Sequence, residues 1–483
     1  MAVVINGSGT VTGLAVGGLP DGIVDSGTLA TNSVDSAELI DGAVDNSHID
    51  AMAASKLTGA LPAISGANLT GLVSSLSSMS DATVSASSPT ITTNPSAVGY
   101  YWINSTSGEA YIATDVTTDE NVWTNIAGGS DVQPYTFDPS SPYDYGDGSD
   151  GNVTSVTVTD TYLTNSPSSG TSSCTVNSST GFSSGDQVLI IQTQKSSLTT
   201  GTFEMIAISG ISTNTITFAT TLQNSYSSGS SAVTTQMVRI PQYQSVTLSS
   251  TFNVPAWDGN EGGIFICKCL GTFALSAQIN ATGKGFRGGT AASVGYGNGS
   301  AQGEGQQDNS SNDTERNASG GGGGRMNSPG SLSAKSGAGG AHAAAGTNGD
   351  SNAYGGASWG GQDLTSHLGF GGGGGAGGYD YSTAGASGSN GGGIIIIMAD
   401  TLTLSGSGEL SASGIGGVTG AGAGDGGGGA GGSIYIKSGD FNSNSNCNAS
   451  AGAGSEDGGA GSAGRIHVQG TLTGSTNPTA YTG

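Results

Sequence analysis

The feature that most constrains this chain of 483 residues is the concentration of glycine in its second half. The interval from Gly283 to Gly470 holds 59 of the 89 glycines, without the strict period of three that collagen requires. Ordering glycine costs more backbone entropy than ordering other residues, so such tracts are either flexible linkers or closely packed extended segments. Polyglycine-II-like packing, in which neighbouring segments exchange N–H···O=C hydrogen bonds, needs no apolar side chains.

Apolar segments that flank the glycine tracts repeat along the chain. The segment AQINATGKG (277–285) corresponds to GELSASGIG (408–416) at an offset of 131 residues, and the same offset aligns Ile264 with Ile395. Further copies begin with GGSIYI and GRIHV. A run of consecutive isoleucines at 394–397 predicts a strand that is buried on both faces. The matched spacing favours ordered packing over flexible linkers in a glycine-rich domain, which we place at residues 247–483.

Residues 1–75 carry a different periodicity, with an apolar residue at every fifth position from Leu14 to Ala54. Five is neither the helical period of 3.6 nor the strand period of 2. One residue in five is too thin a stripe for a single chain to bury, but it suits identical chains wound about a common axis. The pattern predicts a trimeric stalk. A single-chain β-solenoid with five-residue sides and a disordered leader stay open as alternatives.

Two β-modules are expected between the stalk and the glycine-rich domain. A Ser/Thr-rich linker at 76–99 precedes alternating residues that predict a small β-meander over 100–130. Residues 131–246 hold β-branched, alternating runs that predict an antiparallel sandwich or a small barrel. The whole chain is thus predicted to be all-β, elongated and fibrous. Either the core of the meander or a sugar-binding surface is expected from its large aromatic residues, Trp102, Tyr111 and Trp123.

The charge balance argues against several classes of function. The chain has 11 Lys and Arg residues against 35 Asp and Glu, and the resulting net charge of −24 would repel nucleic acid. Its four cysteines are too few for a disulfide framework. The N-terminus lacks the cationic segment of a signal peptide, and no apolar run is long enough for a membrane helix. Assembly in the cytoplasm, without membrane insertion, is therefore expected.

Two regions resemble the tail fibres of tailed bacteriophages, particularly marine phages that infect cyanobacteria. The N-terminal resemblance rests on GSGTVTGLAVGGLPDGIVDSGTLA, ASKLTGALPAISGANLTGL and YYWINSTSGEAYIATDVTTDENVWTNIAGG. From Asp147 onward the chain resembles a glycine-rich family of phage tail and bacterial surface proteins, through TGFSSGDQVLIIQTQ, PAWDGNEGG, INATGKGFRGG, GGGIIIIMADTLTLSG and SAGRIHV. A looser analogy is the glycine-rich adhesin of some T-even-like fibres, where polyglycine helices carry loops that touch the host. The resemblance implies a virion or surface adhesin, and it supplies no catalytic residues.

Two motifs that suggest catalysis lie in the wrong context. The segment GKGFRG (283–288) fits a dinucleotide-binding fingerprint, but the residues after it cannot sustain the helix that such a site needs. The segment GASWG (356–360) fits a nucleophile elbow but lacks the flanking strand and helix. The sequence therefore indicates no catalytic residue and no cofactor.

Two groups of metal-ligand residue types have simpler explanations. Asp144, Asp147 and Asp150 lie three apart, unlike the ligands of an EF-hand, and are expected to form a solvated acidic turn, with Ca²⁺ binding as the alternative. Cys267 and Cys269 lie on one face of a strand without two further ligands nearby, as small core residues do. No metal site is expected.

Aromatic residues interrupt the glycine tracts in polar surroundings, with neither the strand nor the helix period. Aromatic faces stack on sugars, and exposed residues on a rigid scaffold commonly form binding surfaces. Alternatively, these side chains fill gaps in the scaffold. The receptor-contact candidates are Tyr354, Trp359, His367, Phe370, Tyr379 and Tyr381.

The combined expectation is a homotrimeric tail fibre of the virion that binds a bacterial surface glycan or an outer-membrane protein. Its N-terminus would attach to tail, baseplate or adaptor proteins. Weak contacts from three chains would add up through a high effective concentration. The alternatives are a tailspike-type polysaccharide depolymerase, which requires two carboxylates in a groove, and a bacterial surface adhesin.

Overall fold

The computed structural model describes two units separately, Met1–Val73 and Ser74–Gly483. In the first unit only the antiparallel strands β1 (Val4–Ile5) and β2 (Val11–Thr12) are described, so the predicted five-residue stripe lies outside the described residues. The second unit is described over 81–106, 109–119, 121–126, 145–195, 200–229, 233–291, 300–306, 318–324, 334–350, 353–380 and 383–482.

The described residues form strands and no helix, which confirms the prediction of an all-β chain. The described residues accordingly contain no helix that is long and apolar enough to cross a membrane.

Residues 81–126 form a small sheet with strand order β3-β4-β5-β6. Its strands are β3 (Ala82–Ser85), β4 (Tyr101–Asn104), β5 (Ala110–Asp115) and β6 (Val122–Asn125). The last three pair antiparallel as predicted, whereas β3 comes from the segment expected to be a linker and pairs parallel with β4. The Trp123 ring is buried, with the rings of Tyr100 and Trp102 edge-on at centroid distances of 6.3 and 5.8 Å. The aromatic residues therefore form the core of this module.

Six antiparallel strands form the next module, in the order β8-β13-β10-β11-β12-β9. They are β8 (Asp160–Tyr162), β9 (Ser173–Thr175), β10 (Gln187–Gln194), β11 (Phe203–Ser212), β12 (Thr215–Phe218) and β13 (Thr234–Ile240). The two outer strands meet, because Leu163 pairs with Val176 and the Thr164 N–H donates to the Thr175 carbonyl at 2.9 Å. The predicted sandwich or barrel is thus a closed barrel, and its interior holds buried side chains such as Ile190, Ile206 and Met237.

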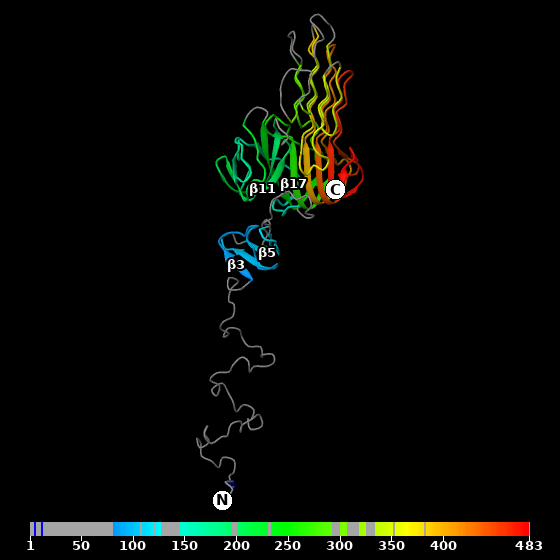
Figure 1. Ribbon diagram of the computed structural model, residues 1–483. Helices are drawn as coiled ribbons and strands as arrows, with labels where there is room; N and C mark the ends of the chain where they lie inside the picture. The colour runs from blue at the N-terminus through cyan, green and yellow to red at the C-terminus, as the bar shows by residue number, and fades with distance from the viewer. Residues whose placement is uncertain are drawn as a thin grey trace. The chain divides into compact units, whose positions relative to one another are not determined.

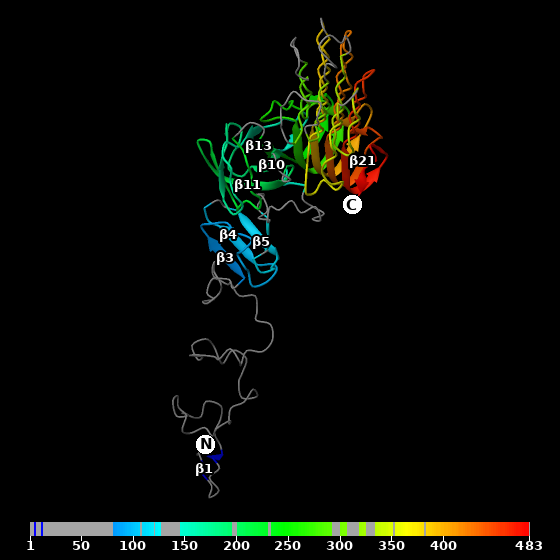
Figure 2. The same cartoon turned by 45° about the horizontal axis from the view of Figure 1, so that its top comes forward.

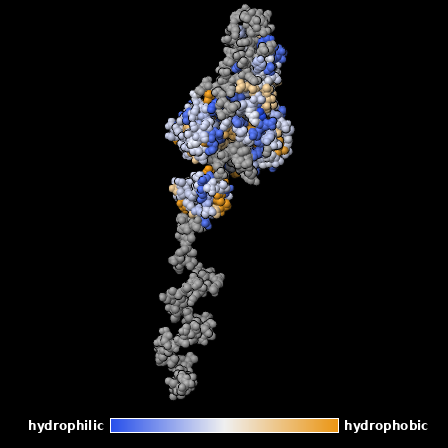
Figure 3. Space-filling model, in the orientation of Figure 1, coloured by the Kyte–Doolittle hydropathy of each residue, from blue (hydrophilic) through white to orange (hydrophobic). Residues whose placement is uncertain are grey.

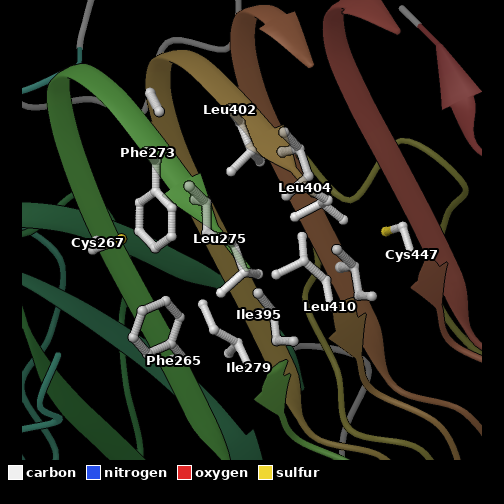
Figure 4. Packing of buried hydrophobic residues seen from close by; sticks show 14 of the residues in the cluster. Phe265, Cys267, Phe273, Leu275, Ile279, Ile395, Leu402, Leu404, Leu410 and Cys447 are labelled. Carbon is white, nitrogen blue, oxygen red and sulfur yellow. The ribbon is translucent and has the colours of Figure 1, made fainter. Parts of the chain in front are cut away.

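Beyond the barrel the chain winds into two parallel sheets that form a β-solenoid. The first sheet contains β7 (Asn152–Val153), β14 (Gln242–Tyr243), β15 (Ser245–Leu248), β17 (Ile264–Leu275), β19 (Ile394–Leu404), β21 (Ser433–Asn442), β23 (Arg465–Thr473) and β25 (Tyr481–Thr482). The second contains β16 (Phe252–Asn253), β18 (Gln278–Asn280), β20 (Glu409–Ser411), β22 (Cys447–Asn448) and β24 (Thr476–Asn477). The core lies between the sheets, where Phe265, Phe273, Ile279, Ile395 and Leu410 point toward one another (Figure 4).

The sequence repeat corresponds to this stacking. Its offset of 131 residues holds for the short strands β18 and β20 but not for the long strands β17 and β19. Ile279 pairs with Leu410, 131 residues on, as the alignment predicted. The alignment of Ile264 with Ile395 was wrong, because Ile264 pairs with Ile394. A bulge after Cys269 and unequal turns between the paired strands change the spacing, and neither is visible in an ungapped alignment.

The barrel packs against the outer face of the first solenoid sheet. Ile395 and Ile397 point into the solenoid core, whereas Ile394 and Ile396 lie in a second cluster with Leu189 and other barrel residues. This arrangement confirms that the isoleucine run of β19 is buried on both faces. The Cys267 and Cys269 side chains lie in the solenoid core, as expected of small core residues.

The glycine tracts pack as extended segments that run side by side beyond the ends of the strands (Figures 1 and 2). We call this packing the glycine lattice. Residues 371–378 lie at its centre, and their N–H groups donate to three different segments with a period of three. Gly371, Gly374 and Gly377 donate to carbonyls within 386–392. The residue after each of these donates to a carbonyl within 335–341, and Gly373 and Ala376 donate to carbonyls within 301–304. All of these N···O distances are 2.7–3.1 Å.

The same central segment accepts hydrogen bonds from further neighbours. Residues 424–430 and 321–324 donate to its carbonyls at 2.7–2.9 Å, and Gly289 donates to the Gly374 carbonyl at 2.8 Å. A threefold extended helix that is bonded to neighbours in all three directions has the geometry of packed polyglycine II. The glycine tracts are therefore ordered scaffold in the described residues.

Glycine is required because neighbouring backbones leave no room for a side chain. A Cβ atom added to Gly374 would lie 2.1 Å from the Gly427 carbonyl oxygen, and one added to Gly372 would lie 2.0 Å from that of Ser319. The high glycine content, which on its own would suggest a flexible linker, is thus what allows the backbone segments to approach this closely.

Candidate functional site

Three of the six receptor-contact candidates reach the surface. Tyr354 is 48% exposed, and its carbonyl accepts a hydrogen bond from the Gly322 N–H at 2.9 Å, so its backbone belongs to the glycine lattice. Trp359 and His367 are partly exposed. We call these three residues the aromatic surface.

The other three candidates do not contribute to it. Phe370 and Tyr379 are buried, which corrects the expectation that they face a receptor. The Phe370 ring packs with the rings of Trp257 and Phe286 at centroid distances of 5.5 and 5.2 Å. It directly precedes the central lattice segment, so it fills the junction between lattice and sheet, as the alternative interpretation proposed. Tyr381 lies outside the described residues.

The Trp359 side chain is held in place by glycines and by two histidines. A Cβ atom added to Gly201 or Gly369 would lie 2.3 or 2.1 Å from the indole ring, so these glycines make room for it. The rings of His342 and His367 lie 6.1 and 6.2 Å from the indole, the first tilted and the second edge-on. The indole is therefore partly exposed and yet fixed in orientation.

Side chains from β21 and β23 hold the segment 359–370, which we call the strap. Arg465 Nη2 donates to the Trp359 carbonyl at 2.8 Å, and Ser433 Oγ donates to the Gly369 carbonyl at 2.7 Å. The Asp363 carbonyl accepts a hydrogen bond from His467 Nδ1. Because three carbonyls of the strap are bonded to one sheet, the solenoid positions Trp359 and His367.

The two buried histidines near the strap are neutral at pH 7. His342 Nδ1 donates to the Gly431 carbonyl at 2.9 Å. Burial lowers the His342 pKa to about 4, with the nearby Arg465 charge acting in the same direction. Burial also lowers the pKa of His467, against the opposing effect of its hydrogen bond to Asp363. Neutral imidazoles avoid placing further positive charge beside Arg465.

This arrangement suits non-covalent contact with a sugar. An indole face packs against sugar C–H groups, and the His367 imidazole 6.2 Å from it offers a polar contact. Around Trp359, the His342 and His467 rings bond to backbone carbonyls, and His367 Nδ1 lies 3.1 Å from the hydroxyl oxygen of the adjacent Ser366.

The sequence did not identify the residues that support the surface. Arg465 and His467 lie more than 100 residues from Trp359 and Asp363 along the chain and reach the strap from β23, whereas the His342 carbonyl accepts the Trp359 N–H at 2.9 Å. The segment SAGRIHV, which contains two of them, stood out as a family landmark. That was the one available signal.

A second group of ionisable residues lies where the barrel meets the solenoid. Asp160 on β8 has its pKa raised by burial and by the charge of Asp258. The Glu261 pKa is raised by burial and by the charges of Asp160 and Asp258. Three carboxyl groups therefore share one region, and two of them are shifted toward the protonated form.

The acidic turn considered for Ca²⁺ has a structural role instead. Asp150 Oδ1 pairs with Arg239 at 2.7 Å, and its Oδ2 accepts the Gln242 N–H at 2.7 Å. Asp147 Oδ1 accepts the Ser149 N–H at 2.8 Å within the turn. Asp144 lies outside the described residues, and no cluster with the geometry of a metal site occurs in the part of the chain that is described.

No protein-family model and no curated protein matches the chain. Among solved structures, the tailspike protein gp49 of Pseudomonas phage LKA1 matches 25% of this chain and 21% of its own, at 16% identity and a TM-score of 0.15. The gp54 tailspike of Acinetobacter baumannii bacteriophage AP22, solved with capsular saccharide, matches 66% of this chain and 56% of its own, at 12% identity and a TM-score of 0.17. Both neighbours are thus phage tailspikes, matched over part of their length at TM-scores too low to establish a shared fold.

Proposed function

We propose that this chain is a tail fibre protein of a bacteriophage that attaches the virion to a bacterial surface saccharide through Tyr354, Trp359 and His367. The observation that carries the proposal is the Trp359 indole, which is partly exposed and yet fixed by Gly201, Gly369 and the strap. A preorganised aromatic ring loses little conformational entropy when it binds. The sequence resemblance to tail fibres supports the same assignment.

The proposed mechanism is multivalent adhesion. Each aromatic surface would bind weakly, and three chains joined as a homotrimer, with several fibres on each virion, would raise the apparent affinity by effective concentration alone. The net charge of −24 favours divalent cations at the contact with an anionic cell envelope. The N-terminus would attach to tail or baseplate proteins.

Binding of the purified chain to immobilised host polysaccharide and to host cells tests the proposal. We expect Trp359→Ala to weaken binding by about fivefold or more, and Tyr354→Ala and His367→Ala by less, because stacking on an indole contributes about 1 kcal/mol or more. Tyr162→Ala, which removes a partly exposed barrel aromatic, is the matched control and should leave binding unchanged. Unaltered binding by a folded Trp359→Ala variant would contradict the proposal.

The alternative function, a polysaccharide depolymerase, is favoured by one observation. Asp160 and Glu261 have raised pKas in the company of Asp258, and a glycoside hydrolase needs one carboxyl group that stays protonated near neutral pH. Incubation with host polysaccharide would then shorten the polymer, and Asp160→Asn or Glu261→Gln would abolish the shortening. An intact polymer after incubation with wild-type chain excludes this alternative.

A further inference from the structure

One sheet face of the small module of residues 81–126 leaves large apolar side chains exposed. One face of its sheet carries Trp102, Tyr111 and Trp123, which form the core. Because strand side chains alternate, the opposite face carries Val84 and Tyr101, which are 42% and 39% exposed.

The strand register makes this open face continuous. Val84 on β3 lies beside Ile103 on β4, and Ile103 lies beside Ala110 on β5. The Ile126 N–H donates to the Ala110 carbonyl at 2.8 Å, and Ile126 is 52% exposed. A row of apolar side chains thus crosses the sheet, and Tyr101 and Ile112 form a second pair next to it. We call these residues the open face.

Exposed apolar side chains are concentrated on this module. Of the large hydrophobic residues that are exposed in the described part of the chain, Val84, Val98, Tyr101 and Ile126 belong to residues 81–126, and the others are scattered over the rest: Leu270, Tyr354, Ile415, Val418 and Tyr481. Figure 3 shows apolar surface gathered on the module. Contiguous apolar patches on soluble proteins mark interaction sites, whereas single exposed apolar residues do not.

We propose that the open face is where copies of this chain associate with one another. The first reason is charge. A chain with a net charge of −24 repels its own copies, so association requires a surface without acidic groups. Among the residues of the four strands only Asp115 is charged, and it lies at the end of β5. The face is therefore apolar and almost neutral on an otherwise strongly acidic chain.

The second reason is position along the chain. The five-residue stripe that predicts association of identical chains ends at Ala54, and β3 begins at Ala82. Copies joined through the stripe would hold their modules within the reach of fewer than 30 residues, at an effective concentration of roughly millimolar. Weak apolar contacts suffice at that concentration. This inference rests on the proposed assembly of identical chains and is independent of saccharide binding.

Cysteine cross-linking of the full chain tests the proposal directly. The four native cysteines are all buried, so a new surface cysteine is the only accessible thiol. We expect Val84→Cys chains to be joined into covalent dimers by a short bifunctional maleimide. Ser87→Cys is the matched control, because Ser87 is also exposed but its carbonyl accepts a hydrogen bond from Trp102 Nε1, whose ring lies on the core face. It should remain uncross-linked while reacting freely with a monofunctional maleimide.

Three outcomes overturn the proposal. The first is that the chain is found to be a monomer by analytical ultracentrifugation. The second is that the chain is an oligomer but neither cysteine variant is cross-linked, and the third is that both variants are cross-linked to the same extent. A second variant, Val84→Thr with Ile126→Thr, keeps the β-branched shapes but adds hydroxyl groups. It should raise the dissociation constant between copies about tenfold or more, at unchanged folding. Trp359→Ala in the Val84→Cys background should cross-link normally, so loss of saccharide binding and loss of self-association are told apart.

Discussion

At the scale of single residues, glycine acts in this molecule through the side chain that it lacks. Gly374 lies with its Cα close to the Gly427 carbonyl, where a Cβ atom would come within 2.1 Å. Because the contact is with backbone on both sides, neither neighbour can move a side chain away. We expect Gly374→Ala to destabilise the chain by roughly 1–3 kcal/mol, measured by denaturant unfolding.

The matched control is Gly210→Ala on β11. An added Cβ at Gly210 meets no atom within 4 Å, and the residue has no left-handed backbone conformation. Alanine there reduces the entropy of the unfolded chain and should change stability by less than about 1 kcal/mol. Equal losses for the two variants would mean that close backbone packing does not hold the lattice together.

His342 gives the stability a dependence on pH. Its pKa is about 4 in the folded chain and 6.5 when unperturbed, so folding favours the neutral ring. The stabilisation is complete above pH 6.5 and is lost as the pH falls from 6.5 toward 4. The loss at pH 4 is about 3 kcal/mol, since each unit of pKa shift corresponds to about 1.4 kcal/mol.

His342→Asn keeps an amide donor for the Gly431 carbonyl and removes the titration. Asp160 and Glu261, with raised pKas, act in the opposite direction, because acid relieves their buried charge. The measurement is therefore the difference between wild type and variant in unfolding free energy at pH 7 and pH 4. Parallel pH profiles would show that folding does not lower the His342 pKa.

At the scale of elements, the pattern of apolar residues predicted what lies on each side of β19. Ile395 lies in the solenoid core and Ile396 in the cluster shared with the barrel, and both are at most 1% exposed. We expect Ile395→Ala and Ile396→Ala each to cost about 2–5 kcal/mol in chemical unfolding. Thr403→Ala on the same strand, which is partly exposed, should cost much less. A strand with one solvated face would tolerate one of the two isoleucine changes.

The parallel stacking itself was only partly predictable. The repeat placed Ile279 against Leu410 correctly, because the second strands are short and uninterrupted. The alignment of the repeat was wrong for the preceding long strands, β17 and β19. There, Leu270 and Gly271 of β17 lie opposite the single residue Asp400 of β19. A one-residue slip exchanges the two faces of a strand, so a bulge that leaves no sequence signal decides which isoleucine faces the core.

The candidate site was likewise predictable from the sequence only in part. Trp359 and His367 were predicted from their polar surroundings, which is a local property. Phe370 has similar neighbours in sequence but is buried, because Trp257 and Phe286 from an earlier turn of the chain meet it. Long-range packing of this kind has no local pattern, and the supporting residues Arg465 and His467 were missed for the same reason.

At the scale of the whole molecule, the glycine lattice replaces the third side of a solenoid. Each long strand and its short partner build two sides, and the chain returns through the lattice to begin the next rung. The central segment is bonded to 301–304, 335–341 and 386–392, which belong to its own connection between β18 and β19, and to 424–430 in the next connection, between β20 and β21. Removing the β20–β21 connection would therefore leave unpaired backbone groups in the central segment.

This connectivity predicts that solenoid, lattice and barrel unfold together. Phe370 joins the lattice to the cluster in which Leu189 of the barrel and Ile396 of β19 pack, whereas the module of residues 81–126 has its own small core around Trp123. Scanning calorimetry should show one large transition for residues 145–482, separate from any transition of the small module. Gly374→Ala and Ile395→Ala should both lower the temperature of that large transition and leave the other unchanged. If Gly374→Ala instead splits the large transition in two, the lattice folds independently of the sheets that it closes.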